Sequence, residues 1–192
     1  SINNIVIEKE KIMKKTIIII ISIIVLIGIV VCGLFFNKGE QPKEKEKKLQ
    51  ATGEIENMLN TIYSNANVEL PDLETSSIDV NDEMMVSTFT GLKSNTNVEE
   101  IIVSTPLINA QAYSVAVVKV NEKADINQMK QEMLDNIDMR RWICVSAEKL
   151  YITNYENIIF LVMSSEEFAK PVYEEFKKFV ENDIGKELEK SE

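Results

Sequence analysis

The chain contains no histidine, and its 192 residues include only six glycines and two cysteines. Without histidine, neither a Ser-His-Asp nor a Cys-His catalytic arrangement is possible, and the commonest metal ligand is missing. The glycines are scattered and do not have the spacing of a phosphate-binding loop. We therefore predict no catalytic residue, no metal site and no cofactor.

The two cysteines also exclude a disulfide framework. Cys32 lies inside an apolar run and Cys144 lies far away in the C-terminal half, so we expect them not to pair. Next to Ile143 and Val145, Cys144 is expected to be a buried, inert residue, and a reactive thiol is the less favoured alternative.

Positive charge is scarce in the C-terminal three quarters of the sequence. The whole sequence has 21 Lys+Arg and 31 Asp+Glu, of which residues 1–48 contain nine and five. Residues 49–192 therefore hold 12 basic and 26 acidic residues, a formal net charge of −14. Because non-specific nucleic-acid binding depends on neutralising phosphates with Lys and Arg, we expect no nucleic-acid partner.

Residues 17–36 lack any charged side chain. A helix of this length is about 30 Å long, the thickness of a bilayer's hydrocarbon core. The run is longer than the apolar part of a cleaved signal peptide and has no small-residue cleavage pattern. We interpret residues 17–36 as an uncleaved, single-pass membrane anchor. A lipoprotein signal attaching lipid at Cys32 is the less favoured alternative, because the branched Val31 precedes the cysteine.

Residues 1–16 are expected to be a cytoplasmic N-terminus, and residues 1–12 to precede a native start at Met13. The lysines on the two sides of the run nearly balance, so the positive-inside rule alone does not orient it. On its signal-like start we expect the C-terminal domain to be extracytoplasmic. Residues 37–50 alternate Lys and Glu and are expected to be a solvated linker. We predict a single domain over residues 51–185 and a tail over residues 186–192.

The domain shows both helical and strand periodicity. Apolar side chains recur on one face of Thr52–Asn65, with Thr52 as its cap, and Asp125 can cap a further helix. Two more helices are expected, near residues 82–88 and from Ser164 or Ser165 onward. Strands are expected at residues 100–104, 113–120, 149–154 and 158–163. Pro71 and the cluster Thr75-Ser76-Ser77 are read as a loop. The element order predicts an α+β fold, an antiparallel sheet of about four strands with helices packed on one face.

Part of the domain resembles a known bacterial family. The similarity is carried by Thr105-Pro106-Leu107-Ile108-Asn109, by the valine-rich segment 112–120, by a helix led by Asp125 and by the apolar segment 157–164 with the helix after it. These residues resemble the family catalogued as domain of unknown function 4358. The resemblance implies an envelope-associated, lipid- or membrane-anchored protein of a Gram-positive-type bacterium. It supplies no catalytic residue, because the family has no established activity.

Acidic residues could in principle form a calcium site or an acid–base pair. Asp79-Val80-Asn81-Asp82-Glu83 lacks the glycine and the downstream glutamate of a calcium loop and reads as a solvated helix start. Adjacent carboxylates, Glu99 with Glu100 and Glu174 with Glu175, are nominal acid–base pairs, although neighbours on a helix do not face one another.

The single constellation that suggests binding is Arg140-Arg141-Trp142. Two cations beside an indole can hold an anionic or aromatic ligand, or a partner segment. The alternative is structural: arginines near a helix C-terminus with Trp142 in the core. We thus expect a non-enzymatic binding domain for an unidentified envelope protein or small ligand, of unknown oligomeric state. A carboxylate-dependent envelope hydrolase and a structural envelope component are the alternatives.

Overall fold

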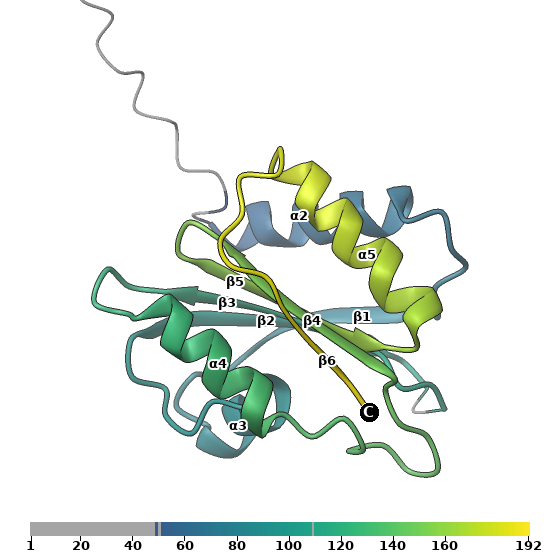
Figure 1. The fold of residues 1–192 in the computed structure, drawn as a ribbon, viewed down its shortest axis with the longest axis horizontal. Coiled ribbons are helices and arrows are strands. Elements are labelled where there is room, and N and C mark those ends of the chain that lie inside the picture. Colours follow the sequence, from purple (N-terminus) through teal and green to yellow (C-terminus); the bar gives the residue numbers. More distant parts are fainter. Residues whose placement is uncertain (1–48, 50, 109) are drawn as a thin grey trace, which may run out of the picture. The chain divides into compact units, whose positions relative to one another are not determined.

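One antiparallel sheet organises the part of the protein that the computed structural model describes, residues 49, 51–108 and 110–192 (Figure 1). The strands are β1 (Leu73–Ile78), β2 (Val98–Pro106), β3 (Ser114–Val120), β4 (Lys149–Tyr155), β5 (Ile158–Ser164) and β6 (Leu188–Ser191). Their spatial order is β1-β2-β3-β5-β4-β6, with every neighbouring pair antiparallel. The most apolar strands, β3 and β5, lie at the centre, which confirms the prediction of an inner strand at residues 113–120.

Helices cover both faces of this sheet, so the expectation of helices on one face is wrong. The helices are α2 (Thr52–Asn65), α3 (Glu83–Thr90), α4 (Ile126–Asn136) and α5 (Glu166–Phe179). Figure 1 shows α2 and α5 on one face and α3 and α4 on the other. The physical reason lies in β5, whose residues are buried at every position. A strand that is apolar on both faces needs cover on both.

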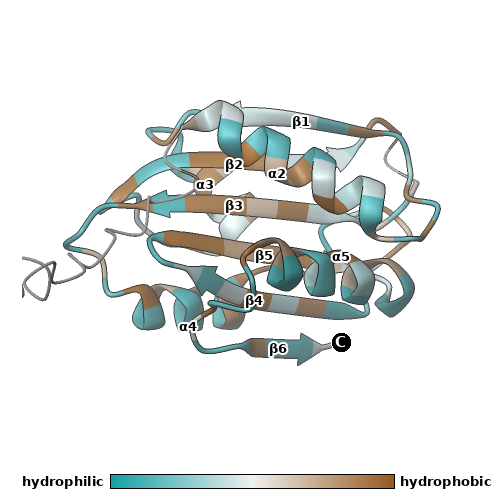
Figure 2. Ribbon diagram, turned by 90° about the horizontal axis from the view of Figure 1, so that it is seen from above, coloured by the Kyte–Doolittle hydropathy of each residue, from teal (hydrophilic) through white to brown (hydrophobic). Residues whose placement is uncertain are grey.

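The helices and the sheet enclose two cores, which we name the upper core (the α2/α5 face) and the lower core (the α3/α4 face). In the upper core, Phe160 of β5 stacks on Phe176 of α5 with ring centroids 4.1 Å apart. In the lower core, Leu161 of β5 clusters with Met133 of α4 and Val86 of α3. Figure 2 shows the apolar colouring concentrated on the central strands and the more polar colouring of β1.

Local capping explains where three helices begin. The side chains of Asp82 and Asp125 accept hydrogen bonds from the backbone N–H groups of Met85 and Gln128, so both aspartates cap as expected for helix starts. Thr52 does not cap α2, because it is the first helical residue and its hydroxyl donates to Glu100 instead. The α2 N-cap is Ala51, whose N–H donates to the Glu54 carboxylate at 2.9 Å.

Both edge strands differ from the sequence-based expectation. Residues 75–77, read as a loop, lie within β1 and pair with residues 102–104 of β2. Residues 186–192, read as a tail, include β6, which pairs with β4. The sheet therefore has six strands where about four were predicted. The predicted anchor at residues 17–36 lies outside the described residues, and no helix among those described is long and apolar enough to cross a membrane.

Candidate functional site

Arg141 and Trp142 lie in the coil that follows α4, beside the C-terminal end of α3. Trp142 packs into the lower core with 8% of its surface exposed. The Arg141 guanidinium lies between two aromatic rings, 4.6 Å from the centroid of Phe89 and 4.8 Å from that of Trp142. It also donates to the Thr88 carbonyl at 2.6 Å. Arg141 is therefore held by Thr88 and Phe89 of α3, and Trp142 takes the core position that the structural alternative assigned to it.

These residues line a cavity of about 410 Å³. Its remaining walls are Thr88 and Phe89 from α3 and Thr105, Pro106 and Leu107 from the end of β2. Burial lowers the pKa of Arg141 to about 10, with Asp138 acting in the opposite direction. Among the described residues, no carboxylate lies within ion-pair distance of this guanidinium. The cavity thus presents a partly desolvated cation, which favours an anionic group.

Arg140 does not contribute to this cavity, contrary to the prediction that grouped it with Arg141. Its side chain is exposed and forms an ion pair with Glu192. Its backbone N–H donates to Asp138 at 2.8 Å. The two neighbouring arginines therefore have different contacts: Arg141 lines the cavity, whereas Arg140 forms an ion pair with Glu192 of the C-terminal segment.

Exposed apolar side chains surround the same end of the sheet. The end of β2, the start of β3 and the start of β4 meet there, because Ser104 pairs with Val115, Ser114 with Met163 and Lys149 with Ser164. The loops that leave these strands expose Leu107 (63%), Ile108 (75%) and Ile143 (82%). Cys144 is exposed as well, with a left-handed φ of 65°, so the expectation of a buried cysteine is wrong. We call Leu107, Ile108 and Ile143 the apolar rim.

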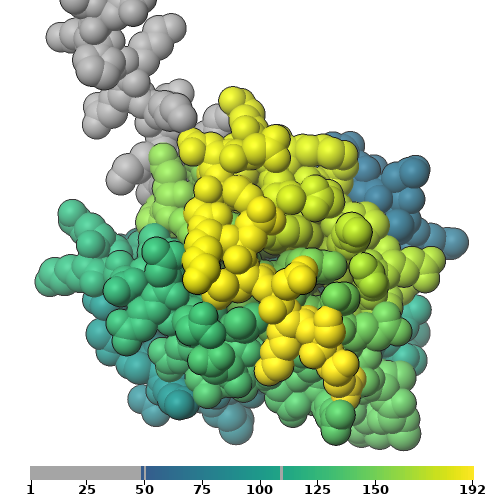
Figure 3. Space-filling model, viewed as in Figure 1, coloured from purple at the N-terminus to yellow at the C-terminus, as the bar shows by residue number. Residues whose placement is uncertain are grey.

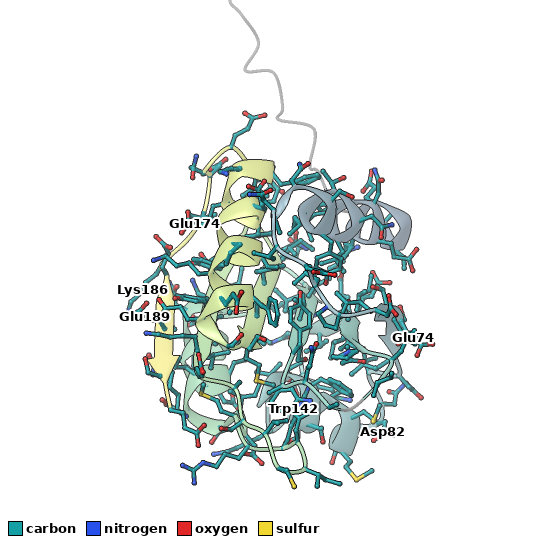
Figure 4. All side chains as sticks on the ribbon, turned by 90° about the vertical axis from the view of Figure 1, so that its right-hand side faces the viewer. Glu74, Asp82, Trp142, Glu174, Lys186 and Glu189 are labelled. Carbon is teal, nitrogen blue, oxygen red and sulfur yellow. The ribbon has the colours of Figure 1, made fainter. Side chains whose placement is uncertain are left out.

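A second and larger cavity of about 510 Å³ lies on the upper face near the β4 edge; we call it the tyrosine cleft. It is lined by Lys149, Tyr151, Glu166, Lys170, Tyr173, Glu174, Glu187, Leu188 and Glu189. Figure 4 shows Glu174 and Glu189 on the same side of the molecule, and in Figure 3 the C-terminal segment crosses the surface from α5. No sequence-based prediction identified this cleft, because its lining comes from β4, α5 and the C-terminal segment.

Two tyrosines form the floor of the tyrosine cleft. Tyr151 and Tyr173 stack with ring centroids 5.0 Å apart and an interplanar angle of 18°. The Tyr173 hydroxyl donates to Glu187 at 2.8 Å. Burial, together with that carboxylate, raises the pKa of Tyr173 far above its ordinary value. Burial and the carboxylates of Glu166, Glu189 and Glu174 raise the pKa of Tyr151 too. Both phenols therefore stay protonated at neutral pH.

The acidic pairs considered from the sequence do not form sites. Glu99 lies 3.8 Å from the Lys119 ammonium, whereas Glu100 accepts from Thr52. Glu175 pairs with Lys178 at 2.6 Å, while its neighbour Glu174 lines the tyrosine cleft, so the two carboxylates do not act together. At residues 79–83 the aspartates bind local backbone and amide N–H groups, as a helix start requires. Within the described ranges no group of three Cys, Asp or Glu side chains is arranged to hold a metal ion.

Comparisons with protein-family models, with curated proteins and with solved structures found no match to this protein. The resemblance to the family of unknown function therefore stays a prediction.

Proposed function

We propose that the protein is a membrane-anchored, extracytoplasmic and non-enzymatic binding domain whose Arg141 cavity captures a partner segment. The observation that carries the proposal is the Arg141 guanidinium, which lines a cavity of about 410 Å³ with no carboxylate paired to it among the described residues. A carboxylate entering the cavity would complete the hydrogen bonding of a desolvated cation. Such charge-assisted bonds are roughly twice as strong as neutral ones.

The surroundings of the cavity favour an apolar segment as the carrier of that carboxylate. Phe89, Trp142 and Leu107 line the walls, and the apolar rim continues outside the mouth. Apolar side chains exposed together mark interaction sites more often than scattered ones do. The simplest segment with both features is the free C-terminus of a polypeptide whose last residue is apolar.

The Arg141 cavity and the start of α2 lie at opposite ends of β2. The described residues begin next to the start of β2, where Thr52 donates to Glu100. The cavity lies at the other end of β2, at Thr105 and Pro106, which is about 20 Å from Glu100 along an extended strand. The first described helix therefore contacts β2 at the end remote from the Arg141 cavity.

A fluorescence titration tests the proposal. Trp142 is the only tryptophan of the sequence and contacts Arg141, so its emission reports on this cavity. We expect a pentapeptide ending in leucine with a free carboxylate to change the emission saturably, and its C-terminal amide to bind at least about tenfold more weakly. Arg141→Gln should reduce the affinity of the free acid by a similar factor.

Arg140→Gln is the matched control, because it removes an adjacent cation that does not line the cavity. Arg141→Lys keeps the charge but loses the planar fork and should bind with intermediate affinity. Equal binding of acid and amide by the wild-type protein would contradict the proposal, as would equal losses in the Arg140 and Arg141 variants.

The hydrolase alternative is favoured by one observation, the four glutamates of the tyrosine cleft. Two of them, Glu174 and Glu187, are already engaged by Lys177. An acid–base pair would have to use Glu166 and Glu189. Release of soluble fragments from purified cell wall, lost in both Glu166→Gln and Glu189→Gln, would establish hydrolysis in place of binding alone.

A further inference from the structure

One hydroxyl that lines the tyrosine cleft, that of Tyr151, has no hydrogen-bond partner among the described residues. Only 8% of the Tyr151 surface is exposed, and its ring is covered by Tyr173. Its hydroxyl makes no hydrogen bond within the described part of the protein and is not enclosed, because Tyr151 lines the cleft. The Tyr151 side chain is thus more than nine-tenths buried, while its hydroxyl, which has no protein partner among the described residues, faces the open cavity.

Carboxylates surround this hydroxyl. Glu189 lies directly opposite Tyr151 in the β4–β6 ladder, so the two side chains lie on the same face. Glu166 and Glu174 reach the same place from α5, and all three carboxylates act on the Tyr151 pKa. Among the described residues, neither Glu166 nor Glu189 has an ion-pair partner.

The neighbouring wall already binds one ammonium group. The Lys177 Nζ atom lies 2.9 Å from Glu174 and 3.3 Å from Glu187. It also lies 5.2 Å from the centroid of the Tyr173 ring. This intramolecular contact shows what the stacked tyrosines and their glutamates accommodate: a primary ammonium group held by two carboxylates over an aromatic ring.

The charged side chains of the tyrosine cleft carry a net negative charge that one further cation would neutralise. The cleft combines Glu166, Glu174, Glu187 and Glu189 with Lys149, Lys170 and the adjacent Lys177, so one negative charge remains. An anion would meet that surplus charge. A sugar would find no open ring face, since Tyr173 covers Tyr151. We propose that the tyrosine cleft binds a singly charged primary alkylammonium group, held by Glu166, Glu189 and the Tyr151 hydroxyl.

In this arrangement the ammonium donates to the two carboxylates and to the phenolic oxygen, while the phenolic proton turns to Glu174 or Glu189. The phenol must be protonated to do so, and the raised pKa of Tyr151 keeps it protonated. The site is independent of the Arg141 cavity, which lies on the other face of the sheet.

Calorimetric titration of the full-length protein in non-ionic detergent tests this inference, with n-butylammonium as the probe and n-butanol as its neutral isostere. We expect saturable binding of the ammonium and none of the alcohol. Glu166→Gln and Glu189→Gln should each weaken binding about tenfold, and Tyr151→Phe about fivefold. Glu74→Gln, which removes an exposed carboxylate of β1, is the matched control and should bind as the wild type does.

Nα-acetyl-lysine amide distinguishes the two sources of such a group. Tighter binding than butylammonium indicates a lysine side chain of a partner, and weaker binding indicates a free amine. Unchanged Trp142 emission in every variant verifies that the fold is intact. The inference is overturned if butanol binds as well as butylammonium, if neither amine binds, or if Glu166→Gln and Glu189→Gln match the Glu74→Gln control. Arg141→Gln leaves the amine titration unchanged, so this result is separate from that of the proposed function.

Discussion

Two tyrosine hydroxyls beneath α2 allow a sharp test of the energetics of this fold. Tyr63 projects from α2 and Tyr113 precedes β3, and both rings belong to the upper core. Neither hydroxyl has a well-formed hydrogen bond among the described residues, although both are fully enclosed. A buried donor without a partner loses its hydration and regains nothing, at a cost of about 1–3 kcal/mol. We therefore expect Tyr63→Phe to stabilise the domain by about 1 kcal/mol at pH 7.

The same hydroxyl makes stability depend on alkaline pH. Burial raises the pKa of Tyr63 to about 12, while the hydroxyls of Ser104 and Tyr113 partly offset the rise. The folded-state pKa thus lies above the ordinary value of 10.0, so the neutral phenol favours the folded state. This contribution is intact below pH 10 and is lost as the pH rises to 12. A rise of this size in the pKa of Tyr63 corresponds to a free energy on the order of 2–3 kcal/mol.

Urea unfolding followed by Trp142 emission measures both effects. Between pH 9 and 12, the free energy of unfolding of Tyr63→Phe should fall less than that of the wild type, by about 2 kcal/mol. Tyr173→Phe is the control, because its hydroxyl donates to Glu187 and its removal should cost about 1 kcal/mol at pH 7. If Tyr63→Phe were destabilised as much as Tyr173→Phe, the hydroxyl would have a bonding partner and the reasoning would fail.

Two further predictions concern close contacts. Gly91 ends α3 with a φ of 78°, and an added Cβ would lie 2.8 Å from the Met133 carbonyl oxygen, so Gly91→Ala should lower the free energy of unfolding by more than about 2 kcal/mol. An added Cβ at Gly53 would meet no atom within 4 Å, so Gly53→Ala should stabilise α2 slightly. Thermal unfolding of both variants checks these two predictions. The buried Lys130 ammonium donates to the Asn154 side chain at 2.6 Å and to the Lys186 carbonyl at 2.6 Å. Asn154→Leu should therefore lower the free energy of unfolding by about 3 kcal/mol and speed hydrogen exchange in residues 186–191. Adding Lys130→Met to the Asn154→Leu protein should recover part of that stability. The prediction of partial recovery is contradicted if the stability loss of the double variant equals the sum of the losses in the two single variants.

The helices and central strands were predictable because local pattern and tertiary environment agree there. The bounds predicted for α2 match the structure, and Asp82 and Asp125 cap the next two helices. The edge strands were missed for the converse reason. β1 carries Thr75, Ser76 and Ser77 because an edge strand is largely solvated, and such a composition also suits a loop. β6 has only four residues, too few for a periodic pattern.

Of the two candidate sites, the one built from sequence neighbours was predictable and the one built from distant segments was not. Arg141 and Trp142 are neighbours in the sequence, so the sequence alone identified them as a candidate binding pair. The sequence could not show that Arg140 lies outside the cavity, because Arg140 pairs with Glu192, which is 52 residues away. The tyrosine cleft has no such local signal. Its glutamates are ordinary surface residues in the sequence, and only the pairing of β6 with β4 brings Glu189 beside Tyr151.

The two cavities carry opposite charge on opposite faces of one sheet, and β4 shows how this separation arises. Successive side chains of β4 point to opposite faces, so Tyr151 joins the upper core while Leu150 and Ile152 join the lower core with Trp142. Substitutions at distant sites without shared partners contribute almost additively to the free energy. Variants of the tyrosine cleft should therefore leave the Arg141 cavity intact. Any coupling measured between the two sites would pass through β4, which contributes to the packing around both, or through the Arg140–Glu192 ion pair, which joins the neighbour of Arg141 to the C-terminal segment of the tyrosine cleft.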